Sequence, residues 1–547
     1  MCLARLLYPA AFCCAALFCA SALAAAPPPG ASPAPRDRAS ALAHNPVIWA
    51  DVPDIAIIRV GKTYYMSSTT MHMSPGLPIM KSTDLVNWRM ASYAYDTLAD
   101  NDALRLDKGM DAYAAGSWAP SLNYRDGVFY ASTFSYTSGR THIFSTRDPE
   151  RGPWKEKSFE PVLHDHSLFF DDDGRVYMVY GGGRITLVEL KSDLSGIKPG
   201  GVNKVLIDNV NTIFGTDLGG LNGEGSHLSK INGRYYLFNI ASPGSRWAPS
   251  VIVHRADRID GPYEGRIALD DRGIAQGGLI DTPDGKWFAY LFKGDGAVGR
   301  IPYVVPVTWK DGWPVLGENG KVPMTLDIPA AAQGVSGASG IVASDEFDRQ
   351  PGDPALPLAW QWNHNPRPND WSLTQRPGYL SLSTSRIVST LTEATNTLTQ
   401  RTFGPNSSAT TSIDVSGMND GDLAGLTAFQ KNYAFVGVKM SAGARSLVMV
   451  SADADKPEEI ASIPLTGKTV HLKVDCEFAP APEVARFSYS LDGKAWTPIG
   501  RPSRLTYSYP KHFMGYRYGL FYYSTKTSGG RVDFDYYRIG QGTKNGR

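Results

Sequence analysis

The chain has few cysteines, and their placement excludes a fold held together by disulfides. Of the five cysteines among 547 residues, four lie within the first 19 residues and the fifth is Cys476. We expect that first segment to be removed, so the mature chain keeps a single thiol and forms no intrachain disulfide. Cys476 lies in the alternating run VHLKVDCE, which predicts a half-buried structural thiol rather than a nucleophile. Stability must therefore come from packed cores.

The chain also lacks an excess of charge of either sign. Its 54 basic and 53 acidic residues give a formal net charge of +1 at pH 7. A chain without a global electrostatic field does not attract polyanions, so we expect no nucleic-acid partner. Aromatic residues, by contrast, make up 11% of the chain, and their flat faces suit both β-structure and the apolar faces of sugar rings. Composition thus permits sugar binding.

The N-terminus has the layout of a secretory signal. Arg5 precedes an apolar run over residues 6–23, and Ala22-Leu23-Ala24 supplies the small residues of a cleavage site. We expect cleavage after Ala24 (signal peptide 1–24), followed by a Pro- and Ala-rich linker over residues 25–44. A transmembrane anchor is the alternative, but Pro9 interrupts the apolar run. We therefore expect no stable membrane insertion and a secreted or periplasmic protein.

After the linker, the sequence shows no credible amphipathic helix. It shows instead a repeated unit of strand, glycine-containing turn and aromatic-rich strand. The unit occurs in the segments IIRVGKTYYM, LNYRDGVFYA, FFDDDGRVYM, LSKINGRYYL and LIDTPDGKWF. Each segment is a predicted hairpin. The turn glycines are separated by 66, 47, 59 and 52 residues, and they are Gly61, Gly127, Gly174, Gly233 and Gly285. An aspartate follows each glycine by 19 to 26 residues, which predicts a second turn in each unit.

These patterns predict an all-β chain with two folded parts. Five units of about 50 residues with two hairpins each are typical of a five-bladed β-propeller, here over residues 45–327. Strictly alternating strands such as YLSLSTS and YAFVGVKMS then predict a β-sandwich over residues 341–547. The small-residue stretch IPAAAQGVSGASG predicts a linker between them, over residues 328–340.

The propeller repeat also predicts which side chains meet. The first strand of each blade lines the central channel, so equivalent positions of different blades face one another. Counting back from the turn glycines, with a turn two residues shorter in the first two blades, gives Asp54, Trp118 or Pro120, Asp165, Glu224 and Gln276. One aspartate in a loop-rich β-protein is most often a solvated turn residue. Three carboxylates at one register instead predict a site where repulsion keeps one acid protonated beside an ionised partner, as glycoside hydrolysis requires.

Four segments carry a family resemblance: NPVIWADVPDIAIIRVGKTYYMSSTT, HDHSLFFDDDGRVY, GEGSHLSKINGRYY and AVGRIPY. Over residues 45–325 the chain resembles family 43 glycoside hydrolases. The sandwich, with LAGLTAFQ and VDFDYYRIG, resembles the concanavalin-like C-terminal domain (a jelly roll) of that family's β-xylosidases. The resemblance implies an inverting, exo-acting β-xylosidase or α-L-arabinofuranosidase. Such an enzyme releases D-xylose or L-arabinofuranose from plant hemicellulose (xylan, arabinoxylan or xyloglucan) and requires no cofactor.

The resemblance also implies catalytic roles. Asp54 of VPDIA maps onto the general base that activates a water molecule, and Glu224 of GEGSHL maps onto the general acid. Asp165 of HDHSLFF maps onto the residue that adjusts the acidity of the general acid and orients it. Inversion requires the base and the acid to stand about 6.5 to 9.5 Å apart. Asp51 is the nearest rival to Asp54, but it precedes the strand, and we expect it to make a turn or a supporting hydrogen bond.

Five further residues are predicted near the substrate. Trp118 resembles a sugar-stacking aromatic residue, with a core tryptophan as the alternative. Arg300 resembles a substrate-contacting arginine, with a structural ion pair as the alternative. Met71 and His72 occupy a stretch where relatives often carry aromatic residues, so we expect a different sugar platform there. Gln276 stands where many relatives have a histidine associated with a metal ion or water, and we therefore predict no metal in the propeller.

Three questions stay open at this level. Asp345 and Asp535 lie where concanavalin-like sandwiches hold Ca²⁺, although such carboxylates are usually only solvated. A secreted carbohydrate-binding propeller without catalysis and an endo-arabinanase are the two alternative functions. Retention of three acids at one register argues against the first, and the attached sandwich argues against the open groove of the second. The motifs do not distinguish xylose from arabinofuranose.

Overall fold

The computed structural model describes residues 42–329, 336–350, 353, 356–453 and 456–542. The predicted signal peptide and residues 25–41 of the predicted linker lie outside the described residues. Within the described ranges there is no α-helix, only four short 3₁₀ turns between strands. None of the helical segments described is long and apolar enough to cross a membrane.

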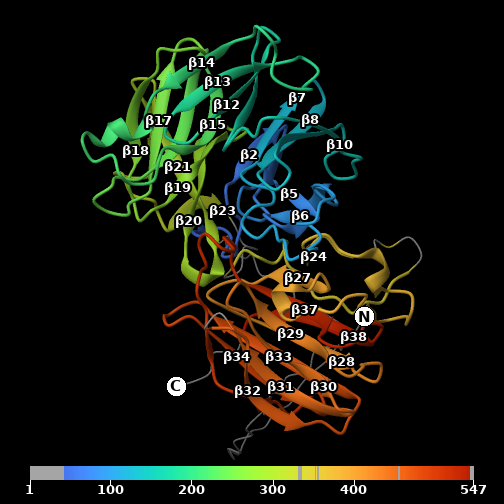
Figure 1. The fold of residues 1–547 in the computed structure, drawn as a ribbon. Coiled ribbons are helices and arrows are strands. Elements are labelled where there is room, and N and C mark those ends of the chain that lie inside the picture. The colour runs from blue at the N-terminus through green and yellow to red at the C-terminus, as the bar shows by residue number, and fades with distance from the viewer. Residues whose placement is uncertain (1–41, 330–335, 351–352, 354–355, 454–455, 543–547) are drawn as a thin grey trace, which may run out of the picture. The chain divides into compact units, whose positions relative to one another are not determined.

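The N-terminal part consists of five four-stranded antiparallel sheets (Figure 1). The first blade contains β2 (Ala56–Val60), β3 (Thr63–Ser67), β5 (Gly76–Ser82) and β6 (Arg89–Tyr95). The second contains β7 (Ser121–Arg125), β8 (Val128–Ser135), β9 (Arg140–Thr146) and β10 (Lys155–Phe159). The third contains β11 (Ser167–Phe170), β12 (Val176–Tyr180), β13 (Ile185–Leu190) and β14 (Asn203–Ile207). The fourth contains β15 (Glu224–Ile231), β16 (Arg234–Ala241), β17 (Ser250–Ala256) and β18 (Glu264–Leu269). The fifth contains β19 (Ala275–Asp281), β20 (Trp287–Gly294), β21 (Arg300–Lys310) and β22 (Trp313–Leu316).

The first strands of the five blades form a closed ring. Each of β2, β7, β11, β15 and β19 contacts the first strand of the next blade, and β19 contacts β2. Each blade runs as a simple meander, in which the second strand returns beside the first. The predicted five-bladed propeller is therefore confirmed.

The predicted turn glycines lie between the first and second strands of their blades. All five have positive φ, from +63° at Gly61 to +81° at Gly174 and Gly285. At four of the five, an added Cβ would meet no atom within 4 Å. Backbone conformation rather than lack of space therefore requires glycine there. The aspartates predicted to mark a second turn also lie where expected. Each lies between the third and fourth strands of its blade: Asp84, Asp148, Asp193, Asp257 and Asp311.

The turn lengths differ from the prediction in one blade. Two-residue turns join the first two strands in the first, second and fourth blades, whereas five-residue loops join them in the third and fifth. Glu224 nevertheless opens β15 at the same end of the ring. β15 also contains a one-residue bulge between Glu224 and His227.

The ring is closed by the two ends of the propeller segment. β1 (Leu42–His44) pairs with β23 (Thr325–Pro329), three residues before the predicted start at Asn45. The side chain of Asn45 then exchanges hydrogen bonds with the backbone of Val304, at 2.8 and 2.9 Å. Part of the predicted 328–340 linker packs on the propeller, because Ala338 joins a hydrophobic cluster with residues of the first blade. Residues 330–335 of this linker lie outside the described residues.

The C-terminal part is a sandwich of two antiparallel sheets. One sheet has the order β32 (Glu458–Pro464), β31 (Ala444–Ser451), β30 (Ala434–Ser441), β29 (Asp422–Phe429), β37 (Arg517–Ser524), β27 (Thr397–Arg401), β24 (Gln361–Asn363) and β4 (Met73–Ser74). The other has the order β25 (Trp371–Ser372), β26 (Leu380–Ser383), β38 (Arg531–Gly540), β28 (Asn406–Asp414), β33 (Thr469–Glu477), β34 (Val484–Ser490) and β35 (Thr497–Pro498), with β36 (Ser503–Arg504) also paired to β34.

Two details of the sandwich differ from the predictions. Its first sheet is completed by β4, which lies between β3 and β5 in sequence and pairs with β24. The two parts are thus joined by backbone hydrogen bonds. Cys476 on β33 is fully buried rather than half-buried, and burial raises the pKa of its thiol to about 12. A thiolate nucleophile near neutral pH is therefore excluded at this position.

Candidate active site

The predicted carboxylates meet at one end of the propeller ring, the end at which the first strands begin. We call it the site end. Asp54 precedes β2, Asp165 precedes β11, and Glu224 opens β15. Because the second strand of each blade returns to this end, the loop before β21 also brings Arg300 here. Asp54, Asp165 and Gln276 have φ values of 52°, 46° and 51°. This shared left-handed conformation, uncommon for residues other than glycine, marks equivalent positions in three blades.

Asp54 is held in a buried ion pair with Arg300. The two residues are 5% and 7% exposed, and Arg300 Nη1 donates to both carboxylate oxygens at 2.9 and 3.0 Å. Burial opposes the charge on Arg300, but the Asp54 carboxylate outweighs it and raises the pKa of the guanidinium. Of the two predicted roles for Arg300, the structure therefore displays the ion pair. The Asp54 carboxylate is thus held beside a permanent cation.

Asp51 has the supporting role expected for it. One of its carboxylate oxygens accepts from the backbone N–H of Arg300 at 2.8 Å, and the other accepts from that of Gly515 at 3.1 Å. Its own carbonyl oxygen accepts from Arg401 Nε at 2.8 Å. Asp51 thus joins a propeller strand to the sandwich.

Asp165 and Glu224 form a second pair with a different character. Asp165 is buried, and its carboxylate accepts from the backbone N–H of Gly225 at 2.9 Å. Burial first, and then the charge of Glu224, raise the pKa of Asp165 to about 7, with a smaller contribution from Asp54. Two carboxyl groups that repel one another in a buried place hold a proton to higher pH than either would alone. A proton is therefore retained beside Glu224 near neutral pH.

His164, for which no role was predicted, lies beside both members of this second pair. Its Nε2 lies 3.3 Å from Glu224 Oε2 and 4.0 Å from Asp165 Oδ2. Its Nδ1 lies 3.0 Å from the hydroxyl of Tyr136, in the loop after β8. Burial lowers the pKa of His164, but the hydrogen bond with Glu224 and the charges of Asp165 and Glu224 outweigh it, so the pKa is raised. The sequence feature that could have predicted a role for His164 is its position next to Asp165 in HDHSLFF.

Aromatic rings line the site, and one of them comes from the sandwich. Trp118 is half-buried, with its ring centre 5.9 Å from that of Phe134 and 5.8 Å from that of Phe513. Phe513 lies in the loop before β37, and its ring centre is 4.2 Å from the guanidinium carbon of Arg300. Its carbonyl oxygen also accepts from Arg300 Nη2 at 3.4 Å. No spacing in the sequence predicts this contact, which joins positions 213 residues apart.

Two of the predicted substrate residues do not face the site. Met71 and His72 are 1% and 0% exposed, and the ring of His72 packs against Tyr113, His364 and His512. The reason is the strand that follows them, since β4 pairs with β24 and draws this loop into the junction with the sandwich. The prediction that His72 and Met71 contact the sugar is therefore corrected.

Gln276 does lie with the carboxylates. Its side chain covers Gly225, next to Glu224, so closely that a Cβ at Gly225 would stand 2.7 Å from Gln276 Cδ. Gly225 also has φ +65°. Both the conformation and the close approach of Gln276 require glycine in the EG pair.

Two places in the molecule bear on the predictions about metal ions. Within the described part of the chain, one group of metal-type ligands has its atoms within 4.8 Å of one another: His164, Asp165 and Glu224. At the predicted calcium position, both oxygens of Asp345 are engaged by Arg349, at 2.9 and 2.6 Å, and Trp360 Nε1 also donates to one of them at 3.0 Å. A calcium ion would have to displace this arginine, so Asp345 does not fit Ca²⁺. Asp535 belongs to no group of metal-type ligands among the residues that the structure describes.

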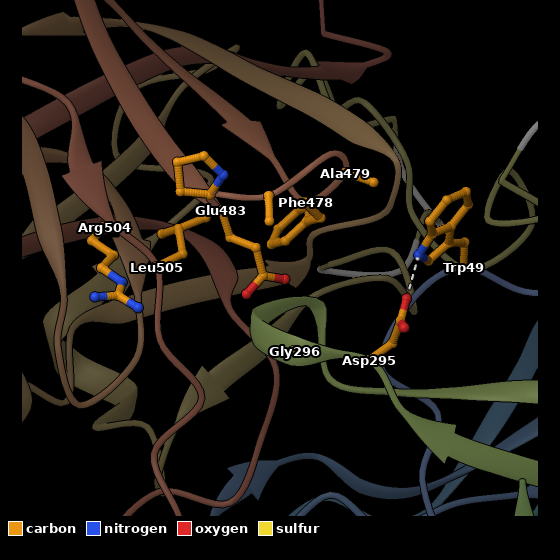
Figure 2. Close-up of a pocket in the computed structure, with 10 residues that line it drawn as sticks. Trp49, Asp295, Gly296, Phe478, Ala479, Glu483, Arg504 and Leu505 are labelled. Atoms are coloured by element: carbon orange, nitrogen blue, oxygen red, sulfur yellow. Dashed lines mark hydrogen bonds between the residues drawn. The ribbon is translucent and has the colours of Figure 1, made fainter. Parts of the chain in front are cut away.

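A separate depression lies where the propeller loop after β20 meets the sandwich (Figure 2). Trp49 Nε1 donates to Asp295 at 3.2 Å. Glu483 reaches across from the sandwich, and both its oxygens accept from the backbone N–H of Ala297, at 3.0 and 3.1 Å. These carboxylates hold the loop that leads into Arg300. We call this contact the Glu483 clasp.

Fold and site together define a glycoside hydrolase: a β-propeller with an ion-paired carboxylate and a proton-sharing carboxyl pair at the end of its ring. The sequence model described as "Glycosyl hydrolases family 43" matches residues 43–314. The model of the "Beta xylosidase C-terminal Concanavalin A-like domain" matches residues 344–540.

Individual relatives agree over most of the chain. A "Putative beta-xylosidase" of Xylanibacter ruminicola is 31% identical over 84% of this chain and 83% of its own length. A "Non-reducing end alpha-L-arabinofuranosidase" of Bacteroides ovatus is 28% identical over 78% of this chain and 82% of its own length. The solved structure of a bifunctional GH43-CE protein of Bacteroides eggerthii superposes with a TM-score of 0.89 at 54% identity, covering 92% of this chain and 64% of that chain. The chain belongs to glycoside hydrolase family 43, as the sequence resemblance implied.

Proposed function

We propose that the protein is an inverting exo-glycosidase that releases D-xylose, L-arabinofuranose or both from the non-reducing ends of plant hemicellulose oligosaccharides. The observation that carries this proposal is the contrast between two carboxyl sites at one end of the ring. Asp54 is buried and paired with Arg300, at 2.9 and 3.0 Å. Asp165 shares a proton with its neighbour Glu224, since its pKa is raised to about 7.

The two sites divide the chemistry. Asp54, as general base, takes a proton from the water that attacks the anomeric carbon. Glu224, as general acid, gives its proton to the departing glycosidic oxygen as the bond to the sugar breaks. Asp165 keeps a proton on the carboxyl pair and accepts the backbone N–H of Gly225, which orients the turn that carries Glu224. A single displacement inverts the anomeric centre, and no cofactor takes part.

Exo-action and the choice of sugar rest on the surroundings. Phe513 of the sandwich lies over Arg300 beside Trp118, which favours a site closed on one side over the open groove of an endo-arabinanase. The names of the relatives include both a β-xylosidase and a non-reducing-end arabinofuranosidase. We favour dual activity because two pentose sugars of similar shape satisfy the same aromatic faces and carboxylates.

The first experiment measures hydrolysis of an aryl β-D-xylopyranoside and an aryl α-L-arabinofuranoside. Wild type, Asp54→Ala and Glu224→Ala are compared, with Asp172→Ala as a matched control because its side chain is 78% exposed in the β11–β12 loop. We expect each site variant to lose about 10²- to 10⁴-fold in rate and the control to keep full activity. NMR of the first-formed sugar should show the inverted anomer.

The competing function is a carbohydrate-binding propeller without catalysis. A wild type that hydrolyses neither glycoside, yet binds xylo- or arabino-oligosaccharides, would replace the enzyme assignment with that one. Full activity of Asp54→Ala would instead remove Asp54 from the mechanism and leave the hydrolase class standing.

We also propose that residues 1–24 direct export and that the mature protein is secreted or periplasmic. The support is the basic residue, apolar run and small-residue cleavage site at the N-terminus. Mass spectrometry of the protein recovered from periplasmic and medium fractions tests this proposal. A mature N-terminus at Ala25 is expected, and full-length protein confined to the cytoplasm would contradict it.

A further inference from the structure

We propose that His164 and Tyr136 form a proton-return path that recharges the general acid Glu224 after each turnover. This inference rests on the proposed function, because it assigns a role to two residues beside the acid of that reaction. It makes His164 a positioning and proton-carrying residue for the acid and leaves the base, Asp54, outside the path.

The path is a continuous row of hydrogen-bonding atoms. His164 Nε2 lies 3.3 Å from Glu224 Oε2, and His164 Nδ1 lies 3.0 Å from Tyr136 Oη. Tyr136 is 54% exposed, so its hydroxyl reaches water. Imidazole is the side chain best suited to this place, because its two nitrogens can accept a proton on one side and donate one on the other.

The imidazole is held in position along this row. The ring of Phe134 meets it edge-on, with ring centres 5.1 Å apart. The carbonyl oxygen of His164 accepts from the backbone N–H of Gly181 at 2.9 Å. A Cβ at Gly182 would stand 3.6 Å from the imidazole and 3.9 Å from Glu224 Oε2, so this backbone packs beside both groups. The contact between His164 and Glu224 is therefore fixed by the third and fourth blades together.

The charges around the ring suit a proton carrier. Glu224 faces it from the fourth blade, Asp54 from the first and Asp165 from its own segment, and their negative charges outweigh the effect of burial. The pKa of His164 is raised as a result. Arg300 neutralises Asp54 directly. The remaining negative charge favours a proton on the Glu224 side of the site.

The proposed step balances without any further reactant. Glu224 becomes a carboxylate when its proton goes to the leaving oxygen. His164 then gives the proton on Nε2 to Glu224 while Nδ1 takes the proton of Tyr136 Oη, which is refilled from water. The imidazole is left with its proton on Nδ1; once the leaving sugar has gone, it releases that proton through Tyr136 and takes a new one on Nε2 from water, which restores the starting form. One proton passes from solvent to Glu224, and only O–H and N–H bonds are made or broken. Asp54 separately returns to solvent the proton it took from the attacking water.

The path matters most while the leaving group still covers Glu224. The side chains of Glu224 and His164 are 31% and 28% exposed before substrate binds, and a sugar bound against the acid reduces that access. Tyr136 contacts water away from Glu224, so protons can enter the path without passing the bound sugar. Recharging the acid therefore does not have to wait for the leaving sugar to diffuse away.

The test compares two substrates that carry the same sugar. One has an unactivated leaving group, such as a xylo-oligosaccharide, and the other is the 2,4-dinitrophenyl glycoside, whose leaving group departs without a proton. For His164→Ala and Tyr136→Phe we expect kcat on the unactivated substrate to fall about 10- to 100-fold, and kcat on the activated one to fall less than about 3-fold. Imidazole added to the buffer should restore His164→Ala in proportion to its concentration.

The controls separate this role from a structural one. His471→Gln is the matched variant, because His471 also bonds a tyrosine hydroxyl, Tyr536, at 3.1 Å, but in the sandwich. It should leave both rates unchanged. His164→Gln keeps a donor to Glu224 without a carrier, so it should fold normally and remain slow.

Three results would overturn the proposal. Equal losses on both substrates would mean that His164 does not act through Glu224. No rescue of His164→Ala by imidazole, or full activity of His164→Gln, would mean that His164 only holds Glu224 in place. Failure of the proposed function has a different signature, because Glu224→Ala would then show no dependence on the leaving group while the His164 variants stayed active.

Discussion

The two sides of the site differ in how they handle a proton. On the base side, Asp54 and Arg300 are 5% and 7% exposed. Hydrogen bonds join the Asp54 carboxylate to the Arg300 guanidinium, a cation that does not titrate near neutral pH. On the acid side, Glu224 is partly exposed, and the pKa values of its neighbours His164 and Asp165 are both raised, that of Asp165 to about 7. One side thus fixes a charge, and the other keeps a proton available.

The two sides also differ in which part of the chain builds them. The acid side uses the propeller alone: Tyr136, His164, Asp165 and Glu224 come from the second to fourth blades, and Gln276 of the fifth packs on Gly225. The base side requires the sandwich, because Phe513 packs on Arg300 and Gly515 donates to Asp51. Changes in the sandwich should therefore act through the base, whatever the leaving group.

The largest expected effect separates the two carboxylates by leaving group. Asp54→Asn should lose about 10²- to 10⁴-fold in kcat with every substrate, because water must be activated in all cases. Glu224→Gln should lose as much with an unactivated glycoside but less than about 10-fold with a 2,4-dinitrophenyl glycoside, which needs little acid catalysis. Steady-state kinetics on both substrates, with Asp172→Asn as the control, decides this. The same leaving-group dependence in both variants would contradict the division.

The next effect should come from the cation of the base side. Arg300→Met leaves the buried Asp54 carboxylate without its partner, and burial alone then favours the protonated form. We expect kcat/KM to fall about 10²-fold at neutral pH and to recover in part as the pH rises, since deprotonation restores the base. Arg266→Met, which removes a guanidinium lying over the Trp313 ring outside the site, is the control. A uniform loss at all pH values would show that Arg300 acts only on the substrate.

A smaller effect is expected on the acid side from the loss of one carboxylate. The pKa of Asp165, about 7, means that the pair holds its proton up to about that pH and loses activity above it. Asp165→Asn removes the negative charge that retains the proton, so the alkaline limb of kcat/KM should move to lower pH by about one unit. Profiles from pH 4.5 to 9 on an unactivated glycoside measure the shift. An unmoved limb would assign the retained proton to another group.

The smallest effect should come from the Glu483 clasp. Glu483→Ala frees the backbone N–H of Ala297, three residues before Arg300, and loosens the loop that positions the base-side cation. We expect a loss of about 3- to 10-fold in kcat/KM, well below the ~10²-fold that a 1 Å misplacement at the reacting centre can cost. The loss should be equal for activated and unactivated leaving groups. Glu477→Ala, which breaks an ion pair with Arg486 on the sandwich, is the control, and a leaving-group-dependent loss would contradict the assignment.

Local patterns were enough to predict the propeller and to bring its acids together. Hairpin turns with glycine and the period of the repeat depend on neighbours in sequence, so the blades could be counted. The register then placed Asp54, Asp165, Glu224 and Gln276 at one end, even though the turn length of the fourth blade was misjudged.

Contacts between distant segments could not be predicted in this way. His72 was expected near the sugar, but the pairing of β4 with β24 buries it, and nothing in the residues around it indicates a partner strand 290 positions later. Phe513 was missed for the same reason. The sequence left calcium at Asp345 open, and it could not indicate that Arg349, four residues further on, takes both oxygens of this carboxylate. A role for His164 could have been predicted, because it is adjacent to Asp165. Sequence spacing alone, however, does not distinguish a histidine that takes part in catalysis from one buried in the core.

The closure of the ring has a consequence for the order of folding. Asn45 finds its partner, Val304, only 259 residues later, and β1 waits still longer for β23. During synthesis or export the beginning of the propeller must therefore stay unpaired until the fifth blade has emerged. Contacts so far apart in sequence slow folding, so an N-terminal fragment that lacks the fifth blade should be unable to close. Truncations ending before residue 300 would then be substrates for proteases rather than smaller enzymes.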